Sequence, residues 1–194
     1  MASDATLAEQ KAQLREACLA RRATAGPLSR AAAGVRLWSR LRHLRGATIA
    51  GYLPIGSEAD PRATMRVLSR DNTICVPIVT ARGAPLRFRQ WWPGCPTAPG
   101  AFGVQEPVEG GWRVPQILIV PMVGFDARCC RLGYGGGFYD RTLAGLGQAE
   151  VIGFALEAQR VDAVPVEETD IALGMIVTEK GVFAPGLPGG DAAV

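Results

Sequence analysis

One stretch of this chain joins an uninterrupted apolar run to a cluster of glycines. Residues 117–123 (Ile-Leu-Ile-Val-Pro-Met-Val) contain no polar side chain, which is typical of a central strand in a parallel sheet covered on both faces. Residues 131–141 then read Arg-Leu-Gly-Tyr-Gly-Gly-Gly-Phe-Tyr-Asp-Arg and lead into a helix-compatible sequence. Because such a strand needs helices above and below its sheet, this stretch favours an α/β fold.

Apolar periodicity predicts further helices and strands that alternate along the chain. Helices are expected over residues 6–24, from Ser29 as N-cap to a point before Gly46, over 61–69 with Asp60 as cap and Pro61 in the first position, and over 137–146. Strands are expected at residues 48–53, 73–79, 85–90, 116–124, 151–156 and 175–178. This alternation predicts a three-layer α/β domain with a mostly parallel central sheet.

The domain is expected to span residues 1–184 as a single unit, because 194 residues suffice for one well-cored domain. Residues 91–114 are rich in Gly and Pro, and they predict a long ordered loop that lies over a functional site. Residues 185–194 are rich in Gly, Pro and Ala, and they predict a flexible tail.

Composition argues against several classes of function. The net charge of +3 is too small to indicate a nucleic-acid partner, and no run approaches the ~20 apolar residues that span a membrane. Five cysteines without a Cys-x-x-Cys pair, together with the single histidine His43, argue against a zinc site. The N-terminal residues lack the apolar segment of a secretory signal. We therefore expect a cytoplasmic protein with reduced thiols, and we expect a monomer.

The glycine cluster is suited to hold an anion. Glycine permits positive φ angles and places no Cβ between the backbone amides and a ligand, and amides at a helix N-terminus attract phosphate oxygens. The spacing matches neither the dinucleotide-binding nor the P-loop glycine pattern. A plain structural turn is the alternative interpretation. Arg131, Asp140 and Arg141 beside the glycines favour a site for a metal-bound nucleotide.

Basic residues of the first predicted helix form a second candidate group. Lys11 and Arg15 lie four residues apart and Arg22 lies two turns further on, so the three side chains share one helical face. This face is either solvated or in contact with a polyphosphate, whose negative charge would relieve the repulsion between the cations.

Carboxylates that can complete such a site follow the predicted strands. Glu58 and Asp126 come after the strands at 48–53 and 116–124, at the sheet edge where α/β folds bind ligands. Surface positions or turns are the alternative for both. Asp140 and Asp170 are candidates for a hard cation such as Mg²⁺, which takes one or two protein carboxylates and also contacts phosphates.

Arginine and tryptophan are mixed in one further segment. Arg87 and Arg89 lie next to Trp91 and Trp92. This combination suits either the binding of single-stranded nucleic acid or packing at the end of a strand.

The glycine segment also resembles the signature of a known enzyme family. Residues 121–126 (Pro-Met-Val-Gly-Phe-Asp) followed by residues 131–141 are similar to the signature of the 5-formyltetrahydrofolate cyclo-ligases. Weaker similarities are Lys-x-x-Leu-Arg at 11–15, Tyr-Leu-Pro at 52–54 with Glu58, Gly-Val-Gln-Glu-Pro at 103–107, Val-Pro-Val at 164–166 with Asp170, and Val-Thr-Glu at 177–179. Together these segments cover nearly the whole chain in the family's order.

The resemblance implies a three-layer α/β fold of the cyclo-ligase and NagB-like type. It implies the conversion of ATP and 5-formyltetrahydrofolate into 5,10-methenyltetrahydrofolate, ADP and phosphate, with Mg²⁺. The residues implied to bind ATP are Lys11, Arg15, Arg131, Gly133, Tyr134, Gly135, Gly136, Gly137, Phe138 and Tyr139. Those implied to contact folate are Leu53, Glu58, Tyr134, Gly135, Gly136, Gly137 and Phe138. Asp140 and Asp170 are implied to serve the metal, and Lys11, Arg131 and Asp140 to act in catalysis.

Some positions depart from the family pattern. Some members carry lysine in place of Gly136 and arginine in place of Tyr134, so more of the phosphate contact would fall here to backbone amides and the remaining cations. Phe138 stands where many relatives have tyrosine, and Phe102 falls near an aromatic position that stacks on folate. Two alternatives stay open: a phosphosugar isomerase or CoA-transferase on a similar scaffold, and a nucleotide- or RNA-binding relative without cyclo-ligase activity.

Overall fold

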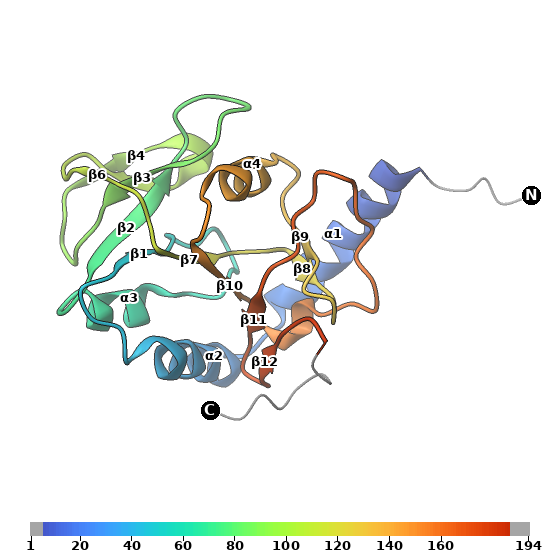
Figure 1. Cartoon of the computed structure of the whole chain (residues 1–194). Coiled ribbons are helices and arrows are strands. Elements are labelled where there is room, and N and C mark those ends of the chain that lie inside the picture. Colours follow the sequence, from blue (N-terminus) through green and yellow to red (C-terminus); the bar gives the residue numbers. More distant parts are fainter. Residues whose placement is uncertain (1–5, 187–194) are drawn as a thin grey trace, which may run out of the picture.

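The structure of the chain, a computed structural model, describes residues 6–186 and is built around one eight-stranded sheet (Figure 1). The helices are α1 (Leu7–Ala23), α2 (Pro27–Leu41), α3 (Arg62–Leu68) and α4 (Phe138–Gly145), with 3₁₀ turns η1 (Ala101–Gly103) and η2 (Glu157–Gln159). The strands of the main sheet are β1 (Thr48–Ala50), β2 (Thr73–Ile78), β3 (Arg87–Gln90), β6 (Trp112–Arg113), β7 (Ile117–Val120), β10 (Glu150–Phe154), β11 (Met175–Val177) and β12 (Val182–Phe183). Two small sheets pair β4 (Thr97–Pro99) with β5 (Gln105–Pro107), and β8 (Gly124–Phe125) with β9 (Arg131–Leu132).

The main sheet is mostly parallel, as predicted. Its strand order is β12-β11-β10-β7-β1-β2-β3-β6, and the five strands from β11 to β2 run in the same direction. The outer strands β12, β3 and β6 are antiparallel to their neighbours. In the register of the centre, Ile49 of β1 lies opposite Ile74 of β2 and Ile117 of β7. The apolar runs therefore mark strands that are buried on both faces.

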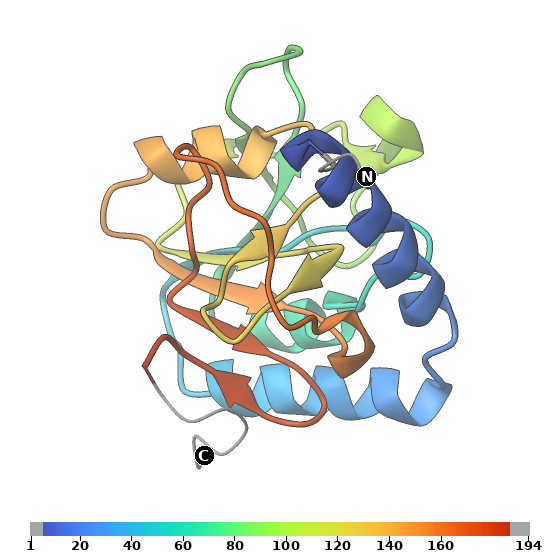
Figure 2. The same cartoon turned by 90° about the vertical axis from the view of Figure 1, so that its right-hand side faces the viewer.

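Alternate residues of each central strand point to opposite faces of the sheet and enter two separate cores. The core on the face that α2 covers, called the lower core, contains Ile49, Ile74 and Ile119 together with Leu37 of α2 and Met65 of α3. The core on the opposite face, called the upper core, contains Ala50, Cys75, Leu118 and Val120, with Phe138 and Leu143 of α4 packed against it. Figure 2 shows α2 below the sheet and α4 above it, so the predicted three-layer architecture is confirmed.

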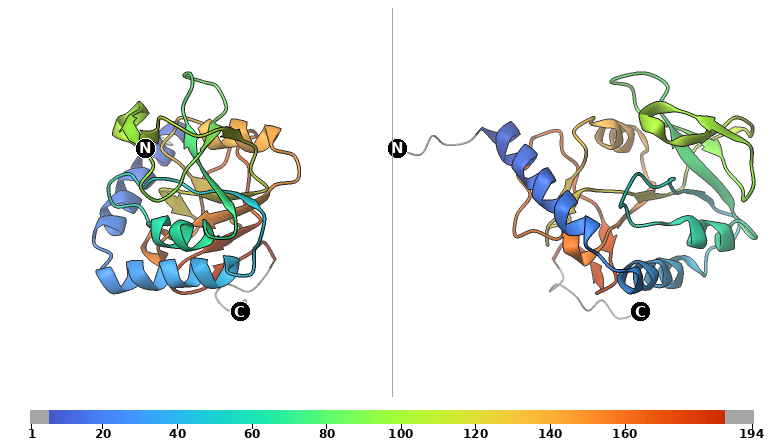
Figure 3. Two further views of the ribbon diagram at one scale, coloured as in Figure 1. Left: turned by 90° about the vertical axis from the view of Figure 1, so that its left-hand side faces the viewer. Right: turned by 180° about the vertical axis from the view of Figure 1, so that it is seen from behind.

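Helix α1 packs against one end of the sheet, where it contacts β8 and η2 (Figure 3). Thr6 and Glu9 begin the helix with a capping box, in which each side chain accepts a hydrogen bond from the other residue's backbone amide. Cys18 then packs closely on Gly124, because a Cβ at that glycine would lie 2.9 Å from the Cys18 sulfur. This contact places the N-terminal helix beside the segment that leads to the glycine cluster.

The predicted strand 116–124 is in fact two strands. β7 ends at Val120 because the next residue is Pro121, which has no amide hydrogen to continue the ladder. The chain then forms β8, which pairs with β9, and the Val123 amide donates to the Leu132 carbonyl over 2.7 Å. The small β8–β9 sheet carries the chain away from the main sheet toward α1 before the glycines begin.

Residues 91–114 contain more regular secondary structure than the predicted ordered loop. They contain the β4–β5 hairpin with η1 at its tip, and then the edge strand β6, which pairs with β3. Strand β12 was also not predicted, because two residues give no periodic pattern. The remaining predicted strands are present, with shorter bounds for β1.

Two helices begin at positions other than those predicted. α2 begins at Pro27 after Gly26, ahead of Ser29, because proline suits the first turn of a helix. Pro61 is the N-cap of α3, not its first residue. Asp60 still satisfies a free amide of the first turn, since its carboxylate accepts from the Arg62 amide over 2.9 Å.

Other expectations concern the whole chain. All five cysteines are free thiols, as expected. Among residues 6–186 no helix combines the length and the apolar character needed to cross a membrane. The predicted tail, residues 185–194, lies outside the described residues after Gly186.

We predict opposite stability effects for two glycine-to-alanine substitutions. A Cβ at Gly153 of β10 would lie 2.6 Å from Met122 Cε and 2.8 Å from Ile176 Cγ1, so Gly153→Ala should lower the free energy of unfolding by about 1–3 kcal/mol through overpacking. Gly34 lies inside α2 with open space around its Cα, so Gly34→Ala should raise it by about 0.5–1 kcal/mol. Urea denaturation measures both, and equal effects would contradict the packing of β10.

Candidate active site

The glycine cluster forms the turn between β9 and α4. Gly135 has a φ of +93° and Gly137, the N-cap of α4, has a φ of +64°, so both positions disfavour any residue with a Cβ. Two arginines bind the carbonyl groups of the turn. Arg15 donates from Nε to the Gly133 carbonyl over 2.9 Å, and Arg141 donates to the Gly136 carbonyl over 2.7 Å. The loop therefore ends at the N-terminus of α4 with two guanidinium groups beside it.

Lys11 is buried, although it belongs to a face that sequence alone could place in solvent. Its side chain extends from α1, is only 8% exposed, and its ammonium lies 2.6 Å from Asp170 Oδ2 and 3.4 Å from Glu167 Oε1. Burial alone would raise the pKa of Asp170, but the hydrogen bonds from Lys11 and from the Glu167 amide outweigh it and lower that pKa. The solvated-face interpretation is therefore wrong for Lys11.

Arg131 connects the glycine loop to the same region. It lies on β9 and donates from Nη1 to the Ile171 carbonyl over 2.6 Å and from Nη2 to Asp140 Oδ1 over 2.5 Å. Asp140, in the first turn of α4, also accepts from the Ile171 amide over 3.3 Å. Because Ile171 follows Asp170 in the chain, these bonds place Asp140 beside the backbone of the residue next to Asp170.

The donor set of this place fits a hard divalent cation. In the described chain, every hydrogen bond to Asp140 is accepted by Oδ1 and every hydrogen bond to Asp170 by Oδ2, so each carboxylate keeps a second oxygen for other use. No cluster of three or more His, Cys, Asp or Glu ligands occurs within residues 6–186. Two carboxylate oxygens suit Mg²⁺, which takes its other ligands from water and phosphates.

Asp126, which sequence analysis placed at the ligand-binding edge, has a structural role. It is fully buried, and its carboxylate accepts from the backbone amides of Arg128, Cys130 and Val164 and from the Arg128 guanidinium. A carboxylate satisfied in this way organises the β8–β9 turn.

Glu58 lies beyond the end of β1 and is only 5% exposed. Its Oε2 accepts from the Ile55 amide over 2.7 Å, which fixes the turn after the strand. Burial raises the pKa of Glu58, while the Ile55 amide, Arg22 and Tyr134 act in the opposite direction. Leu53, the other predicted folate contact of this segment, is half-buried and packs against the lower core.

Arg22 links Glu58 to the glycine loop and was not among the predicted site residues. Its side chain is 2% exposed and donates to Ser57 Oγ over 3.0 Å, to the Met122 carbonyl over 3.3 Å and to the Tyr134 hydroxyl over 2.9 Å. Its position on the same helical face as Lys11 was the signal in the sequence. That signal gave no partner, because the partners come from three distant segments.

Aromatic side chains border the loop on its other side. Phe102, at the tip of the β4–β5 hairpin, is 71% exposed and lies edge-on to Phe138 at a ring-centroid distance of 5.9 Å. Phe102 also has a φ of +56°, which is unfavourable for a residue with a Cβ. The hairpin within residues 91–114 thus reaches the glycine loop. Tyr139 is packed against the upper core, and burial raises its pKa.

The candidate nucleic-acid patch is largely internal packing. Trp91 is buried in the lower core and Trp92 packs against it. Arg89 donates to the Pro107 carbonyl over 3.0 Å, and Arg87 and Arg89 both lie over the ring of Trp112. The packing interpretation of these residues is therefore the better one.

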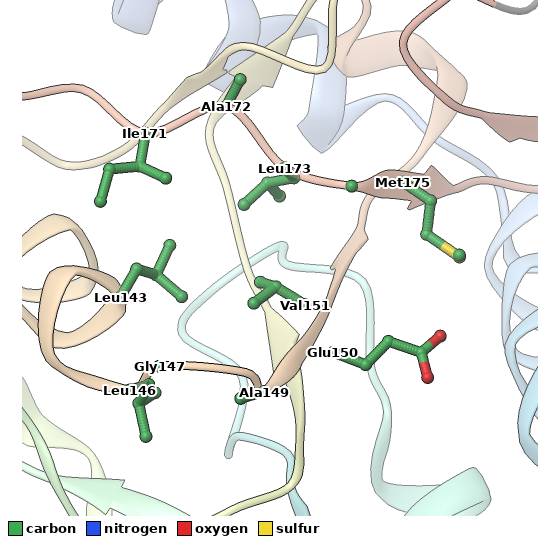
Figure 4. Close-up of a pocket in the computed structure, with 11 residues that line it drawn as sticks. Leu143, Leu146, Gly147, Ala149, Glu150, Val151, Ile171, Ala172, Leu173 and Met175 are labelled. Carbon is green, nitrogen blue, oxygen red and sulfur yellow. The ribbon is translucent and has the colours of Figure 1, made fainter.

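Two pockets lie on either side of residues 171 and 172. A small one of about 90 Å³ is lined by the charged residues Arg131, Glu167 and Asp170, together with Cys130, Val166, Ile171 and Ala172. A larger one of about 370 Å³ lies between the end of α4 and the segment before β11 (Figure 4). Its lining is mainly apolar, with Glu150 as its one charged residue, so it does not suit a polyphosphate.

Comparison with known proteins agrees with this arrangement. A 5-formyltetrahydrofolate cyclo-ligase of Mycolicibacterium smegmatis is 31% identical over 90% of this chain and 96% of its own length, and one of Escherichia coli is 46% identical over 70% and 80%. The solution structure of Aquifex aeolicus 5,10-methenyltetrahydrofolate synthetase superimposes with a TM-score of 0.76 at 28% identity, covering 94% of this chain and 96% of that one. A Mycoplasma pneumoniae 5,10-methenyltetrahydrofolate synthetase, at 22% identity and a TM-score of 0.67 over 87% and 98%, shares the fold. The sequence model of the 5-formyltetrahydrofolate cyclo-ligase family matches residues 7–179, and the chain belongs to that family.

Proposed function

We propose that this protein converts 5-formyltetrahydrofolate and ATP into 5,10-methenyltetrahydrofolate, ADP and phosphate, with Mg²⁺. The observation that carries the proposal is the docking of α1 on the glycine loop, where Arg15 binds the Gly133 carbonyl and Lys11 reaches Asp170. Family membership supports the same reaction. We further propose a monomeric protein of the cytoplasm, where a reducing environment suits its free thiols.

The triphosphate would lie along the glycine loop. Arg15 and Arg141 bond to the turn that leads into the N-terminus of α4. Lys11 and Arg131 are each paired with a carboxylate, and all four cations would be within reach of a polyanion bound at the turn. Gly136 leaves the middle of the loop without a side chain, so the backbone and the neighbouring cations supply the contacts. Fixed cations also stabilise the charge that shifts onto ADP during phosphoryl transfer.

Asp140 and Asp170 would hold the cation. Asp170 is bonded to Lys11 and Asp140 to Arg131, so a metal held by these carboxylates would lie close to cations that can bind phosphate. When bound, Mg²⁺ neutralises phosphate charge and orients the γ-phosphoryl group.

The folate would occupy the space between Glu58 and the two phenylalanines. Phe102 and Phe138 present aromatic edges and faces beside the loop, which suits a planar heterocycle. Glu58 is a buried acceptor at the end of β1, where a ring with adjacent N–H donors can be recognised. The glycine loop is bonded to Arg15 and Arg141 and leads directly into Phe138, so both substrates would contact it.

The chemistry requires positioned charge and no nucleophilic side chain. The formyl oxygen attacks the γ-phosphorus, an O–P bond forms, and the bond to the β,γ-bridging oxygen breaks as ADP leaves. N10 of the folate then attacks the activated carbon, loses its proton, and the C–O bond breaks as phosphate leaves. Holding the two substrates in contact supplies most of the acceleration in such reactions.

The activity assay separates this proposal from a binding module. The protein incubated with ATP, Mg²⁺ and 5-formyltetrahydrofolate should produce the absorbance of the methenyl product, and no product should form without ATP. Lys11→Met should lower kcat/KM for ATP by about 100-fold, since it removes a charged contact to phosphate. The chain has one other lysine, the exposed Lys180, and Lys180→Met is the matched control. Wild-type protein without turnover, or equal effects of the two variants, would contradict the proposal.

The metal assignment has a separate test. Asp170→Asn should raise the Mg²⁺ concentration for half-maximal activity by roughly 10-fold or more, because a neutral amide is a weaker ligand for a hard cation. Asp162→Asn, at an exposed position, should leave the Mg²⁺ titration unchanged. An unchanged titration for Asp170→Asn would remove this residue from the metal site.

Glu58→Gln should increase stability while it decreases activity. The pKa of folded Glu58 is raised above its ordinary value, so the wild type loses stability as pH rises through the window above about 4.5. Glutamine has no proton to lose, so the stability gain of Glu58→Gln in urea should grow with pH across that window. The KM for 5-formyltetrahydrofolate should rise at the same time. The exposed Glu109→Gln is the control, and a stability difference that does not change with pH would contradict the buried carboxylate.

A further inference from the structure

Arg15 of α1 lies along the first part of the glycine loop. Its Nε donates to the Gly133 carbonyl over 2.9 Å, and a Cβ at Gly135 would lie 3.5 Å from its Nη2. Within residues 6–186 its guanidinium forms no ion pair with a carboxylate. A guanidinium has five N–H groups, and this hydrogen bond uses one of them, so the others can bind a ligand.

Arg141 of α4 lies along the second part of the loop. Its Nη2 donates to the Gly136 carbonyl over 2.7 Å, and a Cβ at Gly137 would lie 2.5 Å from its Nη1. Its Cζ lies 5.2 Å from the centre of the Phe138 ring, a distance at which an aromatic ring attracts a cation. In the part of the chain that the structure describes, its Nε is buried without a hydrogen-bond partner and no carboxylate pairs with the guanidinium. Arg141 is therefore held in place but keeps unsatisfied donors.

The position of Arg141 is electrostatically unfavourable without a ligand. Its amide donates to the Gly137 carbonyl over 3.1 Å and closes the first turn of α4, at the helix end where positive charge is disfavoured. The acid of the same turn, Asp140, is paired with Arg131. The unpaired guanidinium of Arg15 lies along the same loop and adds to the positive charge. A bound anion would remove this penalty, because a helix N-terminus favours negative charge.

The two other cations near the loop already have anionic partners. Lys11 Nζ lies 2.6 Å from Asp170 Oδ2, and Arg131 Nη2 lies 2.5 Å from Asp140 Oδ1. A phosphate must compete with a carboxylate for each of these cations, unless a metal ion takes the carboxylate. The two arginines along the loop have no such competitor.

We propose that Arg15 and Arg141 form a phosphate clamp, which binds the polyphosphate chain of the nucleotide along the glycine loop without the help of Mg²⁺. Lys11 and Arg131 join the contact only after a divalent ion has bound their carboxylate partners, a division of roles that rests on the proposed function. Guanidinium groups suit the clamp because their planar N–H pairs bind phosphate oxygens bidentately.

Calorimetric titration of the whole chain with inorganic tripolyphosphate, in EDTA and without folate, tests the clamp. The wild type should bind. Arg15→Met and Arg141→Met should each raise the dissociation constant about 10-fold or more, because each removes charge-assisted hydrogen bonds to phosphate. Removing the whole ion pair with Lys11→Met and Asp170→Asn together should change it far less, because the pair has no net charge. The exposed Arg70→Met is the matched control.

A charge-preserving variant separates phosphate binding from the structure of the loop. Arg141→Lys keeps the charge and loses the planar fork, so its affinity for tripolyphosphate should lie between those of the wild type and Arg141→Met. Equally weak binding by the lysine and methionine variants would indicate a distorted loop and contradict the clamp. If Arg141→Met does not fold in a urea titration, Arg15→Met and Arg141→Lys decide.

This titration does not depend on turnover. Wild-type protein that fails to bind tripolyphosphate without metal, or arginine-to-methionine variants that bind as tightly as wild type, would overturn the clamp even if the protein is an active cyclo-ligase. An ion-pair variant that loses as much affinity as the arginine variants would overturn the division of roles. Arginine-dependent binding in a protein without turnover would support the clamp and overturn the proposed function.

Discussion

The two buried cations of α1 are the constraint on which the arrangement of this protein depends. A charged side chain cannot be buried at tolerable cost unless opposite charge or several acceptors surround it. Lys11 finds Asp170 and Glu167, and Arg22 finds carbonyl and hydroxyl oxygens with Glu58 close by. These partners lie far from α1 in the sequence, between residues 57 and 170. Satisfying them forces the first helix against the glycine loop, and this contact creates the candidate site.

The sheet provides the frame for this contact. β1 and β7 are parallel neighbours, so the segments that follow them leave the same edge, one toward Glu58 and the other toward the β8–β9 sheet and the glycines. The segment after β10 runs through η2, which α1 contacts, and returns past Asp170 to begin β11. Short segments after parallel strands thus supply Glu58, the glycine loop and Asp170. Helix α1 covers them from the end of the sheet.

The fold could be predicted from the sequence wherever the local composition alone decides which residues are buried. Unbroken apolar runs gave the parallel strands, and the Gly-rich turn before a helix gave the loop with its positive φ angles. The break at Pro121 was visible in the sequence but was outweighed by the apolar residues around it. The β4–β5 hairpin was missed because its stability comes from pairing and from the contact of Phe102 with Phe138, not from periodicity. For the site, sequence indicated Lys11 and Glu58 but not their partners. Asp170 lies 159 residues from Lys11, and only the folded chain brings them together.

The ion pair of Lys11 with Asp170 has a consequence for the resting protein. The buried ammonium is matched by a carboxylate of the same fold, so it needs no counterion from solution. In the proposed function, the lysine would pair with a phosphate of the incoming nucleotide and the aspartate with its divalent ion. Neither the lysine nor the aspartate would then be left buried without opposite charge, so a deeply placed lysine remains compatible with reversible binding.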